Sequence, residues 1–121
     1  MDSKDLVRFI VGSLDRHKAE DIQIIGIGDL TIIADYFVIA NGTSAVQVKS
    51  LADYLEKELG EQGITPIRIE GYSTANWILV DYGSVIVHVF YKETRGFYNL
   101  ERLWKDGQHY QLSDFLNPEP A

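Results

Sequence analysis

Two stretches of the chain carry apolar residues at the spacing of an amphipathic helix. The first lies within residues 3–18, where Asp2 or Ser3 can cap the helix, and its apolar stripe consists of Leu6, Phe9, Ile10 and Leu14. The second follows the pattern i, i+3, i+4, i+7, i+11 and consists of Val48, Leu51, Ala52, Leu55 and Leu59. The sequence therefore predicts two helices, each with one face buried against a sheet.

The ends of the second helix are marked by specific residue types. Ser44 can cap its first turn through the hydroxyl, and Gln47, three residues later, can reach back to the Ser44 amide in a capping box. Gly60 or Gly63 can end it, because glycine readily adopts the left-handed conformation that is common just past a helix.

Runs of β-branched and aromatic residues between turn signals predict five strands. These runs lie at residues 22–27, 35–40, 67–70, 77–82 and 85–91. The first two are expected to be neighbours in the sheet. Together with the helices, the strands predict an α/β fold.

The last two strands are separated only by Tyr82, Gly83 and Ser84, a length that favours a tight hairpin. Side chains alternate between the faces of a strand, so this turn pairs odd positions of the first strand with even positions of the second. One face then carries Ile78, Val80, Tyr82, Val85, Val87 and Val89. The other face carries Trp77, Leu79, Asp81, Ile86, His88 and Phe90.

These two faces differ in composition. The first is almost wholly aliphatic, and we assign it to the core beneath the two helices. The second mixes aromatic and aliphatic residues with Asp81 and His88, which is typical of an apolar patch that binds a partner. Alternatively, the segment 97–104 covers this face within the chain. The sequence leaves both alternatives open.

The composition indicates one folded domain. Hydrophobic residues make up 45% of the 121 residues and charged residues 24%, unlike the balance of a disordered chain. The 11 Lys and Arg residues against 18 Asp and Glu residues give a net charge of −7. This charge argues against direct, sequence-specific binding of nucleic acid, because it repels phosphate. It favours a basic protein as partner, although solubility alone also explains it.

Several kinds of site are not indicated. The chain has no cysteine, which excludes disulfides, thiolate zinc sites and a cysteine nucleophile. His17, His88 and His109 show no metal-ligand spacing, so we expect no metal and no cofactor, and we interpret His88 as a packed, hydrogen-bonded residue. The N-terminus lacks a signal-peptide pattern, and no apolar run reaches the roughly 20 residues needed to span a bilayer. A cytoplasmic protein without membrane contact is expected.

The strongest enzyme-like feature is the turn Gly42-Thr43-Ser44, because amides at a helix start can bind an anion such as phosphate. A nucleotidyltransferase also needs a pair of carboxylates on a nearby strand to hold magnesium. At the expected distance Asp53 stands alone, on the exposed face of a helix. We therefore expect no catalytic residues, and a site formed by Asp35, Glu70 and Asp81 is the alternative.

Taken in order, these residues are similar to the Iojap, or ribosomal silencing factor, family over residues 3–105. The matching stretches are Ala34–Ile39, Gly42–Ser44, Val48-Lys49, Ala52-Asp53, Glu70-Gly71, Ala75–Asp81, Gly83, Val87–Phe90 and Glu93–Arg95, followed by Tyr98, Leu100, Glu101, Leu103 and Trp104. No single stretch is specific, whereas their order and spacing are. In one departure, Ala45-Val46-Gln47 stands where many relatives have a basic residue, which puts any contact of that residue in doubt here.

The resemblance implies a mixed sheet with helices, of α+β type, in a nucleotidyltransferase-like topology without catalytic residues. The domain is expected over residues 1–105, with an extension over 106–121 whose tail, 117–121, is disordered. Members of the family bind ribosomal protein fourteen of the large ribosomal subunit at the inter-subunit face. They thereby prevent the small subunit from joining and repress translation when nutrients are scarce. Members also form homodimers.

The family's contact surface lies on the part of the sheet that carries Trp77. We therefore expect Trp77 to be an aromatic anchor for the partner, with Asp81 and Glu70 facing a basic protein. Further candidate contact residues are Leu79, Tyr72, Tyr82, His88 and Phe90. The resemblance thus places the mixed hairpin face in a partner-binding role.

Glu93, Arg95 and Glu101 are expected to hold the C-terminal segment in place rather than to contact a partner. Two other functions stay open. One is a nucleotide-binding enzyme that uses the turn Gly42-Thr43-Ser44, and the other is a dimeric scaffold without a ribosomal role.

Overall fold

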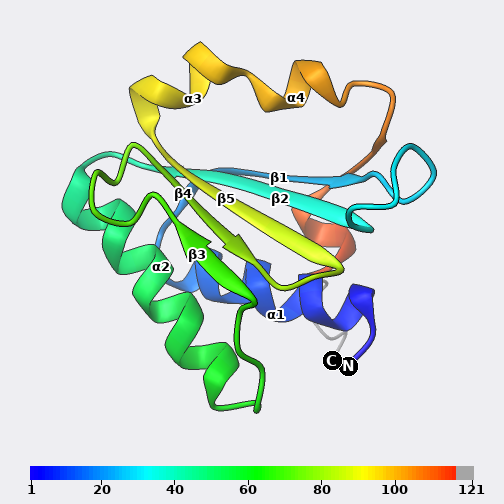
Figure 1. Cartoon of the computed structure of the whole chain (residues 1–121), viewed down its shortest axis with the longest axis horizontal. Coiled ribbons are helices and arrows are strands. Elements are labelled where there is room, and N and C mark those ends of the chain that lie inside the picture. Colours follow the sequence, from blue (N-terminus) through cyan, green and yellow to red (C-terminus); the bar gives the residue numbers. More distant parts are fainter. Residues whose placement is uncertain (117–121) are drawn as a thin grey trace.

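The computed structural model describes residues 1–116 as one sheet with helices on both faces (Figure 1). The strands are β1 (Glu20–Gly26), β2 (Tyr36–Gly42), β3 (Arg68–Glu70), β4 (Trp77–Asp81), β5 (Val85–Tyr91) and β6 (Gln108–Tyr110). The helices are α1 (Ser3–Arg16), α2 (Ala45–Gly60), α3 (Lys92–Tyr98), α4 (Leu100–Leu103) and the 3-10 turn η1 (Leu112–Asp114). In the order β3-β4-β5-β2-β1-β6, only β2 and β5 are parallel neighbours among the described strands. The sheet is therefore mixed, as expected.

The sheet has six strands rather than the five predicted. The additional strand, β6, lies in the segment expected to extend beyond the domain, and it pairs antiparallel with β1. Its residues, Gln108-His109-Tyr110, include no β-branched residue and do not alternate between apolar and polar, so no strand pattern marks it. Phe115, just beyond η1, is only 6% exposed and packs edge-on against Tyr36 and Tyr110. The expected disordered tail, 117–121, lies outside the described residues.

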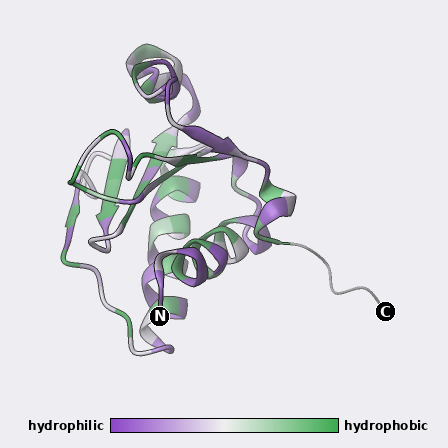
Figure 2. Cartoon of the chain, turned by 90° about the vertical axis from the view of Figure 1, so that its right-hand side faces the viewer, coloured by the Kyte–Doolittle hydropathy of each residue, from purple (hydrophilic) through white to green (hydrophobic). Residues whose placement is uncertain are grey.

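The two long helices, α1 and α2, pack together on one face of the sheet and form the main core (Figure 1). In Figure 2 both helices alternate hydrophobic (green) and hydrophilic (purple) stretches, as the amphipathic patterns predict. The aliphatic face of the β4–β5 hairpin lies in this core, because Ile78 pairs with Val89 and Val80 with Val87. Within residues 1–116, no helix combines the length and apolar character needed to cross a membrane.

The apolar stripe of α1 differs in one position from the prediction. Phe9 is 39% exposed, whereas Val7 and Val11 are fully buried beside Ile10 and Leu14. Positions 7, 10, 11 and 14 follow the helical repeat more closely than a stripe that includes Phe9. The helix therefore turns its valines inward and Phe9 toward solvent.

The N-termini of α1 and α2 are capped by side chains of the residues that precede them. Asp2 caps α1, and the Ser44 hydroxyl caps α2 by accepting the Gln47 amide at 3.0 Å. The second half of the predicted capping box is wrong, because Gln47 does not return to the Ser44 amide. Its Oε1 instead accepts the Thr43 amide at 2.7 Å and the Thr43 hydroxyl at 3.0 Å. The turn 42–44 is thereby tied to the first turn of α2.

The helices α3 and α4 lie across the opposite face of the sheet (Figure 1). Beneath them a second core contains Ile25, Ile27, Ala34, Phe37, Ile39, Ile86, Phe90 and Leu100. The buried Arg95 of α3 donates to Asn41 Oδ1 at 2.8 Å and to the Asp21 carbonyl at 2.6 Å, while Glu101 accepts from its Nε at 3.0 Å. The predicted role of Arg95 and Glu101 in holding this segment is confirmed.

Candidate functional site

The β4–β5 hairpin brings four of the predicted site residues together. In its antiparallel register Trp77 pairs with Phe90, and Leu79 pairs with His88. Residues that face each other across two strands point to the same side of the sheet, so the four side chains share one face. We name these four residues, together with Tyr98 of α3, the docking face.

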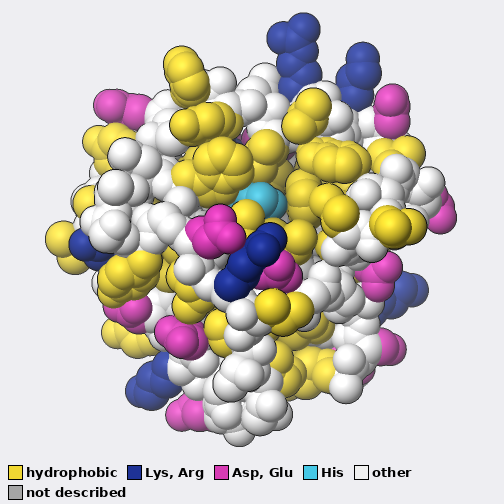
Figure 3. Space-filling view, viewed as in Figure 1, with side chains coloured by type: hydrophobic (Ala, Val, Ile, Leu, Met, Phe, Trp, Pro, Cys, Tyr) yellow, Lys and Arg dark blue, Asp and Glu magenta, His cyan; other side chains and the backbone are white. Residues whose placement is uncertain are grey.

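Burial divides the docking face into a floor and an accessible part. Phe90 and His88 are 0% and 4% exposed, whereas Trp77 and Leu79 are partly exposed and Tyr98 is 49% exposed. Figure 3 shows hydrophobic side chains (yellow) gathered around a histidine (cyan), with charged side chains beside them. The C-terminal helices therefore cover this side of the sheet only in part.

The Trp77 ring contacts its own chain on several sides. Its Nε1–H donates to Nδ1 of His88 at 3.0 Å. Its ring lies 5.0 Å from that of Phe90 at an interplanar angle of 27°, and 4.7 Å from that of Tyr98. Aromatic pairs of this kind contribute roughly 0.5–1.5 kcal/mol beyond the burial of area. Tyr98, expected only as part of the covering segment, thus helps to hold the predicted anchor.

The backbone just before Trp77 is also restrained. Gly71 has a φ of +80°, and a Cβ at this position would lie 2.1 Å from the Trp77 carbonyl oxygen. Ala75, 1% exposed, has a φ of +58°, a conformation that is unfavourable for residues with a Cβ. The loop therefore requires glycine at 71, and it places Trp77 in a fixed position at the start of β4.

His88 is neutral at physiological pH, because burial lowers its pKa to about 4. Its Nδ1 accepts the hydrogen bond from Trp77, so the proton of the neutral ring sits on Nε2. Nε2 is buried and has no hydrogen-bond partner among residues 1–116. The interpretation of His88 as a packed, hydrogen-bonded residue is confirmed, and its burial prevents it from offering a partner much contact area.

The two acidic candidates, Asp81 and Glu70, are paired within the chain. Arg68 Nε lies 3.1 Å from Glu70 Oε2 and 3.4 Å from Asp81 Oδ2. Asp81 is 9% exposed, and its other oxygen accepts the Gly83 amide at 2.8 Å. Asp81 therefore stabilises the hairpin turn, while the side chain of Glu70 is 59% exposed. Arg68 was not among the predicted site residues, although position 68 has the same parity as Glu70.

Tyr72 and Tyr82, also predicted as contacts, do not belong to the docking face. Tyr82 is 9% exposed in the main core, where burial raises the pKa of its hydroxyl. The Tyr72 hydroxyl donates to Asp53 of α2 at 3.0 Å, and Lys49 lies over its ring. Strand parity already assigns Tyr82 to the aliphatic face, whereas no local pattern indicates the contact of Tyr72 with α2.

Two amides at the turn 42–44 and the start of α2 already donate to side chains of this chain. Gln47 Oε1 occupies the Thr43 amide, and the Ser44 hydroxyl occupies the Gln47 amide. A phosphate that used these two amides would first have to displace both side-chain bonds. The geometry of this turn is that of a capped helix.

The carboxylates considered for catalysis do not converge. Asp35 accepts the Ser3 hydroxyl at 2.6 Å, whereas Glu70 and Asp81 both lie beside Arg68. Across residues 1–116, no group of three or more histidine or acidic side chains is placed to hold a metal ion.

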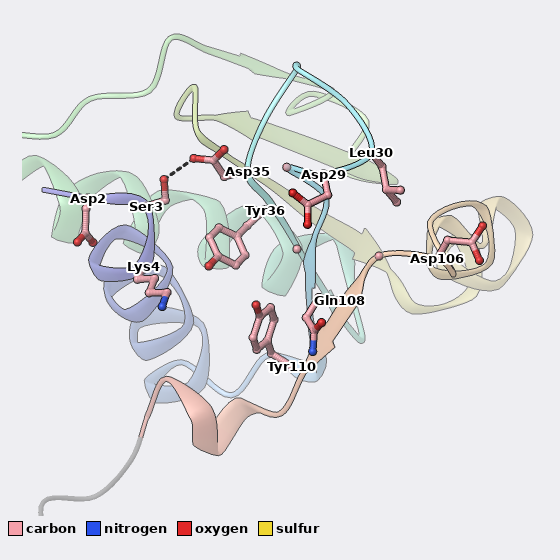
Figure 4. A pocket seen from close by; sticks show the side chains of 13 residues that line it. Asp2, Ser3, Lys4, Asp29, Leu30, Asp35, Tyr36, Asp106, Gln108 and Tyr110 are labelled. Carbon is pink, nitrogen blue, oxygen red and sulfur yellow. Dashed lines mark hydrogen bonds between the residues drawn. The ribbon is translucent and has the colours of Figure 1, made fainter.

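A cleft of about 670 Å³ opens between the start of α1, the β1–β2 loop and β6 (Figure 4). Its charged lining residues are Asp2, Asp29, Asp35, Asp106 and Lys4. The side chains of Tyr36 and Tyr110 also line it. The cleft is acidic and shares no lining residue with the docking face.

Comparison with known proteins identifies the family. The family model described as ribosomal silencing factor during starvation matches residues 1–121. The ribosomal silencing factor RsfS of Bacillus subtilis is 40% identical over 117 residues, which cover 97% of this chain and 99% of that protein. A Mus musculus protein named mitochondrial assembly of ribosomal large subunit protein 1 is 35% identical over 120 residues, covering 93% of this chain and 53% of its own. The crystal structure of a Chromobacterium violaceum protein matches with a TM-score of 0.84 at 32% identity, covering 92% of each chain. By its sequence and its mixed sheet, the chain belongs to the ribosomal silencing factor family.

Proposed function

We propose that this protein binds the large ribosomal subunit through the docking face and, without catalysis, represses translation by preventing the small subunit from joining. The observation that carries the proposal is the partly exposed Trp77, held in place beside Leu79 and Tyr98. Apolar patches with polar neighbours are typical of interaction sites, and a central aromatic residue often dominates the binding energy. The names of the relatives from Bacillus subtilis and Mus musculus support the ribosome as the partner.

The partner that we propose is ribosomal protein fourteen of the large subunit, at the inter-subunit face, in the cytoplasm. A net charge of −7 suits a basic protein better than bare RNA. On β3, at the edge of the docking side of the sheet, Glu70 is exposed, and Arg68 partly neutralises it. Charge therefore contributes less to this contact than two free carboxylates would, and apolar contact contributes more.

We further propose that the free protein forms homodimers, as the family resemblance implies. Phe97 and Leu103, on α3 and α4, are 83% and 71% exposed, which leaves large apolar side chains for a second copy to cover. Sedimentation equilibrium of the free protein tests this point, because a dimer doubles the mass of 13.7 kDa. A single 13.7 kDa species at micromolar concentration would contradict it.

Sedimentation of the protein with purified Bacillus subtilis large subunits tests the proposed function. We expect the protein to sediment with the large subunit, and fewer joined ribosomes to form when small subunits are added. Trp77→Ala should lose this effect, whereas Phe9→Ala, which removes an exposed aromatic side chain from the outer side of α1, should keep it. The proposal fails if the wild-type protein sediments free at micromolar concentration.

A further inference from the structure

We infer that His88 is a positioning residue for docking, which fixes the Trp77 indole in the orientation that the partner binds and takes its N–H out of recognition. The inference rests on the proposed function and deepens it. Its basis is the hydrogen bond that Trp77 Nε1–H donates to His88 Nδ1 at 3.0 Å. In this pair the His88 side chain is buried, whereas the Trp77 side chain is partly exposed. His88 therefore acts through Trp77 rather than by direct contact.

The sheet register places His88 where it can hold the indole. Trp77 faces Phe90 across the two strands, and His88 lies two residues before Phe90, on the diagonal position of the same face. The stacked Phe90 ring restricts the plane of the indole. Stacking alone still permits the ring to slide or turn within that plane, whereas a hydrogen bond donated by Nε1–H fixes which edge of the ring points inward.

The backbone around Trp77 is already restrained, so the orientation of the Trp77 side chain is the main conformational freedom that remains for His88 to restrict. Gly71 approaches the Trp77 carbonyl so closely that the main chain before β4 is already placed, and the buried Ala75 restrains the same loop. Ordering one side chain on binding reduces affinity roughly 2- to 10-fold, so a ring ordered in advance by His88 avoids a loss of that size.

The same hydrogen bond predicts what kind of group the partner offers. The indole has one donor and no acceptor, and that donor is already used within the chain. Trp77 therefore presents only aromatic carbon. We expect the complementary group to be an aliphatic side chain or the aliphatic stem of a lysine or arginine, and not a hydrogen-bond acceptor aimed at Nε1.

Two substitutions separate positioning from packing. His88→Leu keeps apolar volume but removes the acceptor, whereas His88→Asn returns an acceptor oxygen close to the place of Nδ1. We expect His88→Leu to weaken binding to Bacillus subtilis large subunits roughly 2- to 10-fold and His88→Asn to restore it. In the free protein, hydrogen exchange at the Trp77 indole N–H, followed by NMR, should be slow in wild type and His88→Asn and fast in His88→Leu.

A double-mutant cycle makes the test specific, because Trp77→Phe removes the donor and identifies the Trp77 indole signal. In the Trp77→Phe background, His88→Leu should cause no further loss of affinity. An equal loss in both backgrounds would overturn the inference, as would wild-type affinity in a His88→Leu protein whose indole exchanges fast. Failure of the wild-type protein to bind would overturn the proposed function and the docking role with it. The indole signal in the free protein would still show whether His88 orders Trp77.

Discussion

Trp77 is accessible and at the same time hydrogen-bonded within the chain, and unlike Tyr72, which shares both properties, it lies on the docking face. Phe97 is more exposed, at 83%, but it lies on a short helix that contributes few buried residues. An accessible side chain that is already ordered loses little conformational freedom when a partner binds. At the scale of single residues, Trp77 is therefore the position at which substitution should affect binding most.

We expect Trp77→Ala to weaken binding to the large subunit by about 2 kcal/mol or more, roughly 30-fold in Kd, as is typical for a central aromatic anchor. Titration of labelled protein against purified Bacillus subtilis subunits measures this change, with Phe9→Ala as the control for loss of an exposed aromatic group. A folded Trp77→Ala protein of unchanged affinity would place Trp77 outside the interface.

Substitution of Asp81 should change the stability of the fold rather than the electrostatic attraction of a basic partner. The Asp81 carboxylate accepts a hydrogen bond from the Gly83 amide and lies beside Arg68, and the residue is largely buried. Asp81→Ala should therefore lower the free energy of unfolding by about 1–3 kcal/mol. Asp81→Asn keeps an acceptor for the Gly83 amide and should lose less. Urea denaturation of both variants provides the measurement, and equal stability of Asp81→Ala and wild type would contradict this role.

The sequence predicted part of this site for a clear physical reason. Strand alternation is local, so parity alone placed Trp77, Leu79, His88 and Phe90 on one face. The pairing of Arg68 with two carboxylates depends on how β3 lies beside β4, and this register is not contained in either strand. Net charge and strand parity therefore could not predict which acidic side chains are paired within the chain and which are available to a partner.

Among the elements, α1 and α2 are joined by a polar contact at one end. Glu58 of α2 accepts from Arg16 at 2.8 Å, and it lies 2.8 Å from His17 Nε2, just beyond the end of α1. The His17 ring in turn stacks on Tyr54 at 3.8 Å. Although partial burial works in the opposite direction, the hydrogen bonds from His17 and Arg16 lower the pKa of Glu58 to about 2.

This lowered pKa predicts a pH dependence of stability. The folded protein releases the Glu58 proton more readily than the unfolded chain does, so the stabilisation is present above about pH 4.5 and is lost as the pH falls toward 2. We expect Glu58→Gln to cost about 1–2 kcal/mol at pH 7, an amount reduced for solvent screening, and almost nothing near pH 2. Urea denaturation at both pH values tests this, with Glu56→Gln, on the exposed side of α2, as control. A cost independent of pH would contradict it.

A second element-level prediction concerns α3 and α4, which depend on Arg95. Arg95→Ala removes the bonds to Asn41 and the Asp21 carbonyl and leaves Glu101 without its partner. We expect a loss of about 3 kcal/mol, with hydrogen exchange over residues 92–103 accelerated roughly 100-fold. The exposed Arg102 on α4 supplies the control, Arg102→Ala. Unchanged exchange in Arg95→Ala would show that other contacts hold these helices.

The elements that the sequence predicted are those with a clear local pattern, and in most of them this pattern is long. The helices α1 and α2 repeat over three or more turns, and the β4–β5 hairpin has a short connection between alternating runs. By contrast, β6 has no β-branched residue, and α4 has only four residues, which is too few for a helical period to emerge. These short elements depend on the pairing of β6 with β1 and on the ion pair of Arg95, both of which join distant parts of the chain.

For the whole molecule, the folded unit extends past residue 105. Removal of residues 106–116 would take β6 from the sheet and Phe115 from the core. A chain that ends at 105 should therefore lose at least the roughly 3–5 kcal/mol associated with deleting one buried phenylalanine side chain. A chain that ends at 116 is the reference, since it keeps every described residue. Thermal unfolding of the two chains measures the difference, and equal melting temperatures would place the boundary at 105.

The two outermost strands of the sheet, β3 and β6, are each only three residues long. The exposed edge strand β3 carries the charged side chains of Arg68 and Glu70, and β6 carries the exposed Gln108 and His109. Short polar edges give an incoming strand few backbone groups to pair with and oppose the continuous addition of strands that leads to aggregation. Copies of this chain that meet in a crowded cell therefore find few backbone groups at either edge of the sheet to which a further strand could be added.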